Sequence, residues 1–86
     1  MNDKLWNAQS VVLRELLTNL RTGAQLTQQQ LSKELNRPQS YVSKYESGER
    51  KLTLVEIRDI AMSCNSNLES FVTSFEEELK MIEGSK

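Results

Sequence analysis

Residues 28–47 read QQQLSKELNRPQSYVSKYES, a pattern of two short helices joined by a tight turn. In the first half, Leu31 and Leu35 are four apart and therefore project from one face of a helix, whereas the residues between them are polar. Thr27 and Gln30 have the spacing of a capping box, in which each residue's side chain bonds the other's backbone amide. This spacing predicts an amphipathic helix that begins directly after Thr27.

The second half of the stretch predicts a turn and another helix. Asn36 tolerates the left-handed backbone found just past a helix end, and Pro38 disfavours helical geometry at the residue before it. A helix is expected over residues 39–46, with Val42 and Tyr45 on its inner side. Its outward side chains are all polar: Gln39, Ser40, Ser43 and Lys44.

Two helices joined so closely cross at a steep angle, and Ser32 is the small residue expected at their contact. A small residue, a turn former and two apolar residues at this spacing resemble a DNA-binding helix-turn-helix. The longer string LTQQQLSKELNRPQSYVSKYESGER resembles the XRE family of lambda-repressor-like and Cro-like regulators over about residues 12–72. The resemblance implies an all-α fold: a five-helix lambda-repressor-like DNA-binding domain, here with an extended C-terminal helix. Ser32, Asn36 and Pro38 depart from the family's usual residues but are sterically tolerable.

Length and composition set outer bounds on this interpretation. Eighty-six residues are enough for one domain, so residues 1–86 are expected to form a single one. No apolar run reaches the roughly 20 residues that span a bilayer, and the N-terminus lacks a secretory pattern, so a cytoplasmic chain is expected. The chain has no histidine and a single cysteine, Cys64, which is interpreted as a core residue. We therefore expect no metal site, no cofactor and no enzymatic activity.

Charge is distributed unevenly along the chain. Residues 21–58 contain seven basic and four acidic side chains, a net charge of +3, whereas residues 59–86 contain two basic and six acidic ones, a net charge of −4. The positive half contains the helix-turn-helix. One face can therefore meet phosphates while the acidic end points away, although ordinary mixed surface charge would also fit this pattern.

Residues 1–10 are expected to form a polar N-terminal extension, followed by a helix that ends at Gly23. Trp6, in the extension, is interpreted either as a cap over the core or as part of a partner surface. The family resemblance further implies that Arg21 and Glu46 pair across the domain. Apolar residues share one face of this first helix: Leu13, Leu16, Leu17 and Leu20.

A glycine-containing loop with adjacent cations, SGERK, follows the second short helix, and Thr53 with Glu56 then forms another capping box. The last helix is expected over residues 67–83, beginning at Ser66 or Asn67. Its apolar residues are spaced four, three, four and three, the signature of a coiled-coil seam. We expect a dimer contact there, the alternative being that the helix packs back on the first helix in a monomer. The residues of this contact are Val72, Phe75, Leu79 and Ile82.

The outward residues of the second short helix are suited to base edges in the major groove. Gln39 can contact adenine, Lys44 can donate to guanine, and Ser40 and Ser43 can do either; the resemblance also implies base contacts at Gln39, Ser40 and Lys44. Phosphate or backbone contacts are expected from Thr27, Gln28, Tyr41, Arg50 and Lys51.

The sequence thus predicts a transcriptional regulator that binds a double-stranded DNA operator sequence-specifically as a homodimer. The alternative is a protein-interaction module, such as an antitoxin or anti-repressor, that binds a partner protein through its last helix. The polar face of the second short helix favours DNA, since a pure interaction module has no need of it.

Overall fold

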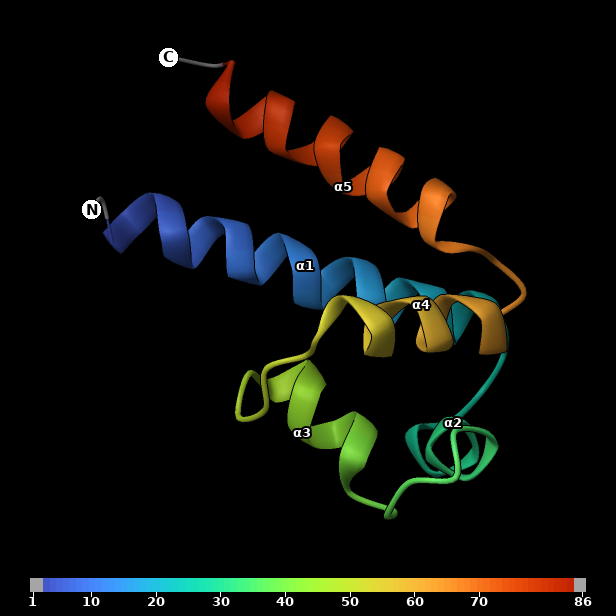
Figure 1. Cartoon of the computed structure of the whole chain (residues 1–86). Helices are drawn as coiled ribbons and strands as arrows, with labels where there is room; N and C mark the ends of the chain where they lie inside the picture. The colour runs from blue at the N-terminus through green and yellow to red at the C-terminus, as the bar shows by residue number, and fades with distance from the viewer. Residues whose placement is uncertain (1–2, 85–86) are drawn as a thin grey trace.

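The computed structural model describes the backbone of residues 3–84 and the side chains of residues 7–84. Five helices occupy this range: α1 (Asp3–Gly23), α2 (Gln28–Glu34), α3 (Tyr41–Ser47), α4 (Leu54–Ser63) and α5 (Leu68–Glu83). Helix α5 runs antiparallel along α1, while α2 and α3 lie on the opposite side of α1 from α5 (Figure 1). The predicted all-α, five-helix fold with a long last helix is confirmed.

The polar residues at the helix starts explain where three of the helices begin. Thr27 with Gln30 and Thr53 with Glu56 form complete capping boxes, as their spacing predicts. At α5 the sequence left two choices, and the structure selects Asn67, whose side chain accepts a hydrogen bond from the Ser70 amide at 2.8 Å. Each cap satisfies an amide that the helix itself leaves without a partner.

One prediction about α1 was wrong: the helix begins at Asp3, so residues 3–10 are part of it and do not form a separate extension. Its end at Gly23 was predicted correctly. The left-handed residue that turns the chain comes two positions later, at Gln25, with φ of 61°. The side chain of Trp6, for which a capping or partner role was predicted, lies outside the described side chains.

All five helices contribute buried residues to the core. Leu17, Leu31, Val42, Tyr45 and Ile60 are essentially inaccessible. Cys64 is also buried, as predicted, and burial raises the pKa of its thiol, which therefore stays protonated at neutral pH.

Helix α3 begins later than predicted. Its first residue is Tyr41, and residues 38–40 form a turn in which the Tyr41 amide donates to the Pro38 carbonyl at 2.9 Å. Gln39 and Ser40 therefore precede the helix. Ser40 occupies the cap position but makes no side-chain cap hydrogen bond.

The side chain that caps α3 comes from α2. Ser32 is fully buried at the crossing of the two helices, as its size predicts. Its Oγ accepts a hydrogen bond from the Val42 amide at 3.2 Å and donates to the Gln39 carbonyl at 3.3 Å. A buried hydroxyl thus takes the place of the missing local cap.

Replacing Ser32 with alanine is expected to destabilise the domain by about 1–2 kcal/mol, because the buried Val42 amide loses its acceptor. Urea denaturation followed by circular dichroism measures this. Ser74→Ala, at an exposed site in α5, is the matched control, since it brings the same gain in helix propensity without breaking this bond. Equal midpoints for the two variants would contradict the capping role of Ser32.

Some residues in the apolar stripe of α5 are buried, and others are exposed. Leu79 is only 8% exposed, and the helix that covers this part of α5 is α1. The prediction that Leu79 contacts a second chain was therefore wrong: the residue is used inside the protomer, as the monomer alternative required. Phe75 is half-buried, whereas Val72 and Ile82 keep 41% and 39% of their surface exposed. A hydrogen bond between Gln9 and Glu83 also links the two helices.

Candidate nucleic-acid interface

The starts of α2 and α3 meet around a shallow hollow of about 700 Å³. The residues that line it all have polar, uncharged side chains: Thr27, Gln28, Gln29, Gln39, Ser40 and Ser43. Five of these six residues are sequence-predicted contacts; Gln29 is the addition. The steep crossing at Ser32 thus brings the predicted phosphate contacts of α2 and the predicted base contacts of α3 to one surface.

The predicted cationic contacts lie apart from this hollow. Lys44 is exposed on α3, and Lys51 is exposed in the loop that follows it. Arg50 is exposed in the same loop, but its guanidinium donates to the Glu56 carboxylate at 2.7 Å. Part of its positive charge is therefore compensated within the protein.

Arg50 belongs to a cluster built on Tyr41. The guanidinium carbons of Arg37 and Arg50 lie 4.8 and 5.0 Å from the centroid of the Tyr41 ring, within the range of cation–π contact. Arg37 also donates to Glu56, at 3.3 Å. Hydrogen bonds from the Thr53 amide and then from Arg50 lower the pKa of Glu56 to about 2, so its carboxylate is ionised at neutral pH and orients both arginines.

Tyr41 is buried, although a contact with the DNA backbone was predicted for it. Its side chain is 5% exposed and packs edge-on against Tyr45 with ring centroids 5.5 Å apart. Burial is the main cause that raises the pKa of its phenol, which therefore stays neutral. The ring belongs to the core and contacts the guanidinium groups of the two arginines.

Arg21 and Glu46 form the ion pair that the family resemblance implied. Arg21 Nε and Nη2 donate to the two carboxylate oxygens at 2.8 and 3.1 Å, with side-chain exposures of only 14% and 8%. The hydrogen bond to Glu46 raises the pKa of Arg21. Gln28 also donates to Glu46, at 2.9 Å, and Arg21 donates to the Leu26 carbonyl. The ends of α1, α2 and α3 are thereby joined at one point beside the hollow.

Two arginines have structural roles that the sequence did not predict. Arg37, the residue before Pro38, was interpreted only as part of the turn, although it contacts Tyr41 and Glu56. Arg14, on α1, donates to the Ser47 carbonyl at 3.0 Å, next to Gly48, which has a left-handed φ of 90°. A β-carbon at Gly48 would lie 2.9 Å from Arg14 Nη1, so the glycine permits this approach. The bonds from Arg37 to Glu56 and from Arg14 to Ser47 carry no sequence signal, because each joins residues far apart in the chain.

A steeply crossed helix pair, with a buried small residue at the crossing and an exposed polar edge on the second helix, defines a helix-turn-helix protein. A family model described as "Helix-turn-helix" matches residues 17–71. The chain is also similar to a solved structure described as an "XRE-family like protein from Pseudomonas syringae pv. tomato str. DC3000", with 33% identity, a TM-score of 0.81, and coverage of 87% of this chain and 92% of that one. The chain therefore belongs to the XRE-type helix-turn-helix family, a family of DNA-binding transcription regulators.

No curated protein matches the chain at a significant level. Among the helices that the structure describes, none is both long enough and apolar enough to span a membrane.

Proposed function

We propose that this protein is a transcriptional regulator that binds double-stranded DNA sequence-specifically, as a homodimer, and reads the major groove with the start of α3. The observation that carries the proposal is the uncharged polar hollow in which Gln39, Ser40 and Ser43 lie beside Thr27 and Gln28. Hydrogen-bonding side chains without competing charge suit base edges, which display donors and acceptors.

Base readout is assigned to residues on and just before α3. Gln39 precedes the helix and can form a paired contact with adenine, while Ser40 and Ser43 can donate or accept. Lys44, exposed one helical turn after Ser40, can donate to guanine acceptors. These four residues lie just before and within the first turn of α3, and the start of the second helix is where helix-turn-helix proteins make base contacts.

Phosphate contacts are assigned to the residues on either side. Thr27 and Gln28 lie at the start of α2, and Lys51 lies in the loop after α3. Arg50 lies in the same loop, where Glu56 compensates part of its charge. Helix α5, which carries five of the chain's twelve acidic residues, lies across α1 from α2 and α3 and would face away from the duplex (Figure 1).

The homodimer is assigned to the part of the α5 stripe that the protomer leaves uncovered. Val72 and Ile82 are exposed apolar residues on this helix, and Phe75 between them is half-buried. Covering them with the same residues of a second copy would remove apolar surface from water and place two α3 helices on one duplex.

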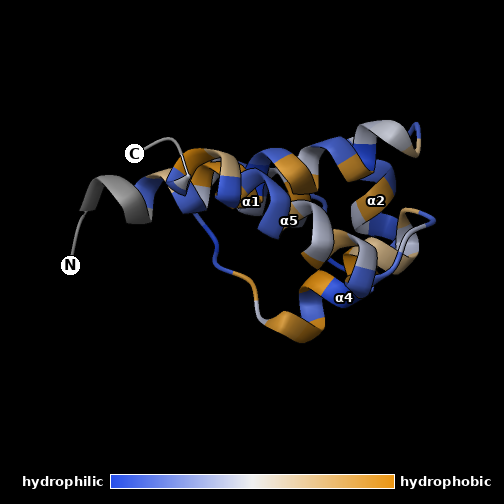
Figure 2. Ribbon diagram, turned by 90° about the horizontal axis from the view of Figure 1, so that it is seen from above, coloured by the Kyte–Doolittle hydropathy of each residue, from blue (hydrophilic) through white to orange (hydrophobic). Residues whose placement is uncertain are grey.

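A protein-interaction role is the second candidate, and exposed apolar side chains support it. The first turn of α4 is hydrophobic (Figure 2), and Leu54 and Val55 there keep 64% and 69% of their surface exposed. Met81 on α5 is 71% exposed. A partner protein held by such residues, as in an antitoxin or anti-repressor, is the alternative that the following experiment distinguishes.

The purified protein should enrich a two-fold symmetric site from a random pool of duplexes, with half-sites about one helical turn apart. Lys44→Ala should weaken binding to that site by about 1–3 kcal/mol and relax its sequence preference. Lys51→Ala should weaken binding to all duplexes alike. It should also reduce the salt dependence of the binding constant by about one phosphate contact.

Lys80→Ala, which removes one charge from α5, is the control and should leave both affinity and preference unchanged. An identical loss on every sequence for Lys44→Ala and Lys51→Ala would refute the division between base and phosphate contacts. No enrichment at low salt would refute DNA recognition and direct attention to protein partners.

A further inference from the structure

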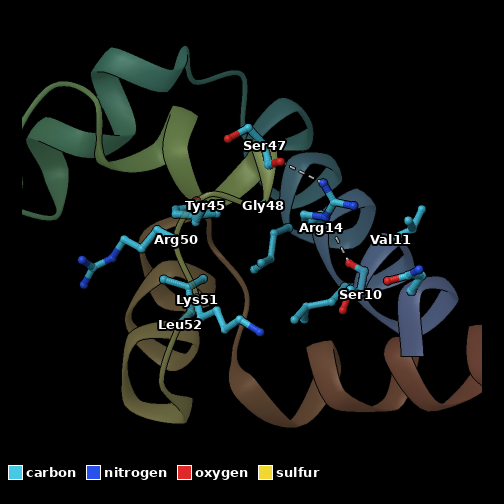
Figure 3. Close-up of a pocket in the computed structure, with 12 residues that line it drawn as sticks. Ser10, Val11, Arg14, Tyr45, Ser47, Gly48, Arg50, Lys51 and Leu52 are labelled. Atoms are coloured by element: carbon cyan, nitrogen blue, oxygen red, sulfur yellow. Dashed lines mark hydrogen bonds between the residues drawn. The ribbon is translucent and has the colours of Figure 1, made fainter. Parts of the chain in front are cut away.

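A second cavity, of about 610 Å³, is separate from the polar hollow. It lies between α1, the end of α3 and the loop that leads to α4 (Figure 3). Its volume falls in the range of small-molecule pockets, about 300–1,000 Å³. Apolar side chains from both sides form much of its wall: Val11, Leu13, Leu17 and Leu52.

The charged residues of this cavity are all cations. Arg14, Arg50 and Lys51 line it, and no carboxylate is among its described lining residues. Arg14 donates to the main-chain carbonyls of Ser10 and Ser47, as Figure 3 shows, and neither of these acceptors carries a charge. The cavity therefore combines an apolar wall with a positive potential, which favours an anion that has an apolar body.

Tyr45 also lines the cavity, but its hydroxyl is not assigned to the ligand. The side chain is 1% exposed, and burial is the main cause that raises the pKa of its phenol, which therefore stays neutral. Glu46 and Arg21, which act on this phenol, form the ion pair beside the polar hollow and are not among the described residues that line the cavity. The polar contacts of a ligand in this cavity are therefore with its cations.

We propose that this cavity binds a small organic carboxylate with an aromatic or aliphatic body. The body packs against the four apolar residues, and the carboxylate lies within the field of Arg14 and Lys51.

The site would connect ligand binding to DNA binding. Arg50 and Lys51 line the cavity and also lie in the loop proposed to approach phosphates. An anion bound there would compete with phosphate for their charge and lower the affinity for duplexes. The test below uses no DNA, so its result is independent of the proposed function.

Nitrogen-15-labelled protein titrated with 1-naphthoate and followed by two-dimensional NMR measures the binding directly. The expected result is a saturable shift of the amides that surround the cavity, including those of Val11, Ser47, Gly48 and Leu52. Neutral 1-naphthamide, which has the same body, should bind at least about fivefold more weakly, because its hydrogen bonds to the cavity are not charge-assisted.

Two variants assign the roles of the polar groups. Lys51→Met should weaken naphthoate binding severalfold, whereas Lys80→Met, which removes an equal charge from α5, should not.

Several outcomes would overturn the proposal. They are no saturation at millimolar naphthoate, shifts confined to other helices, equal affinity for naphthamide, or equal effects of Lys51→Met and Lys80→Met.

Discussion

Replacing Arg21 with alanine is expected to lower the free energy of unfolding by about 3 kcal/mol. The loss leaves the Glu46 carboxylate, which is 8% exposed, without its bidentate partner, and the hydrogen bond that Gln28 still donates to it comes from a neutral amide. The Leu26 carbonyl also loses a donor. In a domain of this size such a change lowers the melting temperature by roughly 12 °C or more. Thermal and urea denaturation both measure it.

A double-mutant cycle with Glu46→Ala separates the pair from its surroundings. Coupling predicts that the double variant is clearly less destabilised than the sum of the two single variants, because the second substitution removes a charge that the first had already left unpaired. Arg58→Ala, an exposed arginine on α4, is the matched control and should change stability by less than about 0.5 kcal/mol. Strict additivity would show that Arg21 and Glu46 contribute independently.

Leu79→Ala is expected to destabilise the protomer by about 3 kcal/mol, whereas Val72→Ala at the same apolar stripe is expected to cost well under 1 kcal/mol. The difference follows from burial: Leu79 is 8% exposed beside α1, and Val72 is 41% exposed. Urea denaturation at low protein concentration measures the protomer alone.

Self-association should depend on Val72, the exposed residue of this pair. Val72→Lys should shift the protein toward monomer in sedimentation equilibrium at tens of micromolar, while the protomer remains folded. An unmodified protein that is monomeric at that concentration would refute the proposed dimer. Equal destabilisation by Leu79→Ala and Val72→Ala would refute the packing of α5 on α1.

Features set by near neighbours in the chain could be predicted from the sequence. The spacing of Thr27 with Gln30, and of Thr53 with Glu56, defines two capping boxes because the atoms involved lie within one helical turn. Asn36 adopts its left-handed backbone for the same local reason. Ser32 could be placed at the crossing because only a small residue fits there.

Features that depend on distant contacts could not be predicted. A seam spacing in α5 does not say whether α1 or a second chain covers it, and so Leu79 was assigned to the wrong side. Tyr41 was assigned to the DNA surface because its position on the helix was known but its burial was not. The arginines around it depend on the path of two loops, which no periodic pattern encodes.

The hydroxyl that Ser32 places at the start of α3 has a consequence for motion. Because α2 supplies the acceptor for the Val42 amide, the first turn of α3 cannot fray without breaking a buried contact with its neighbour. The two helices therefore open and close as one cooperative unit. A surface held rigid in this way loses little conformational entropy when it meets a partner, so more of its contact energy remains available for discrimination.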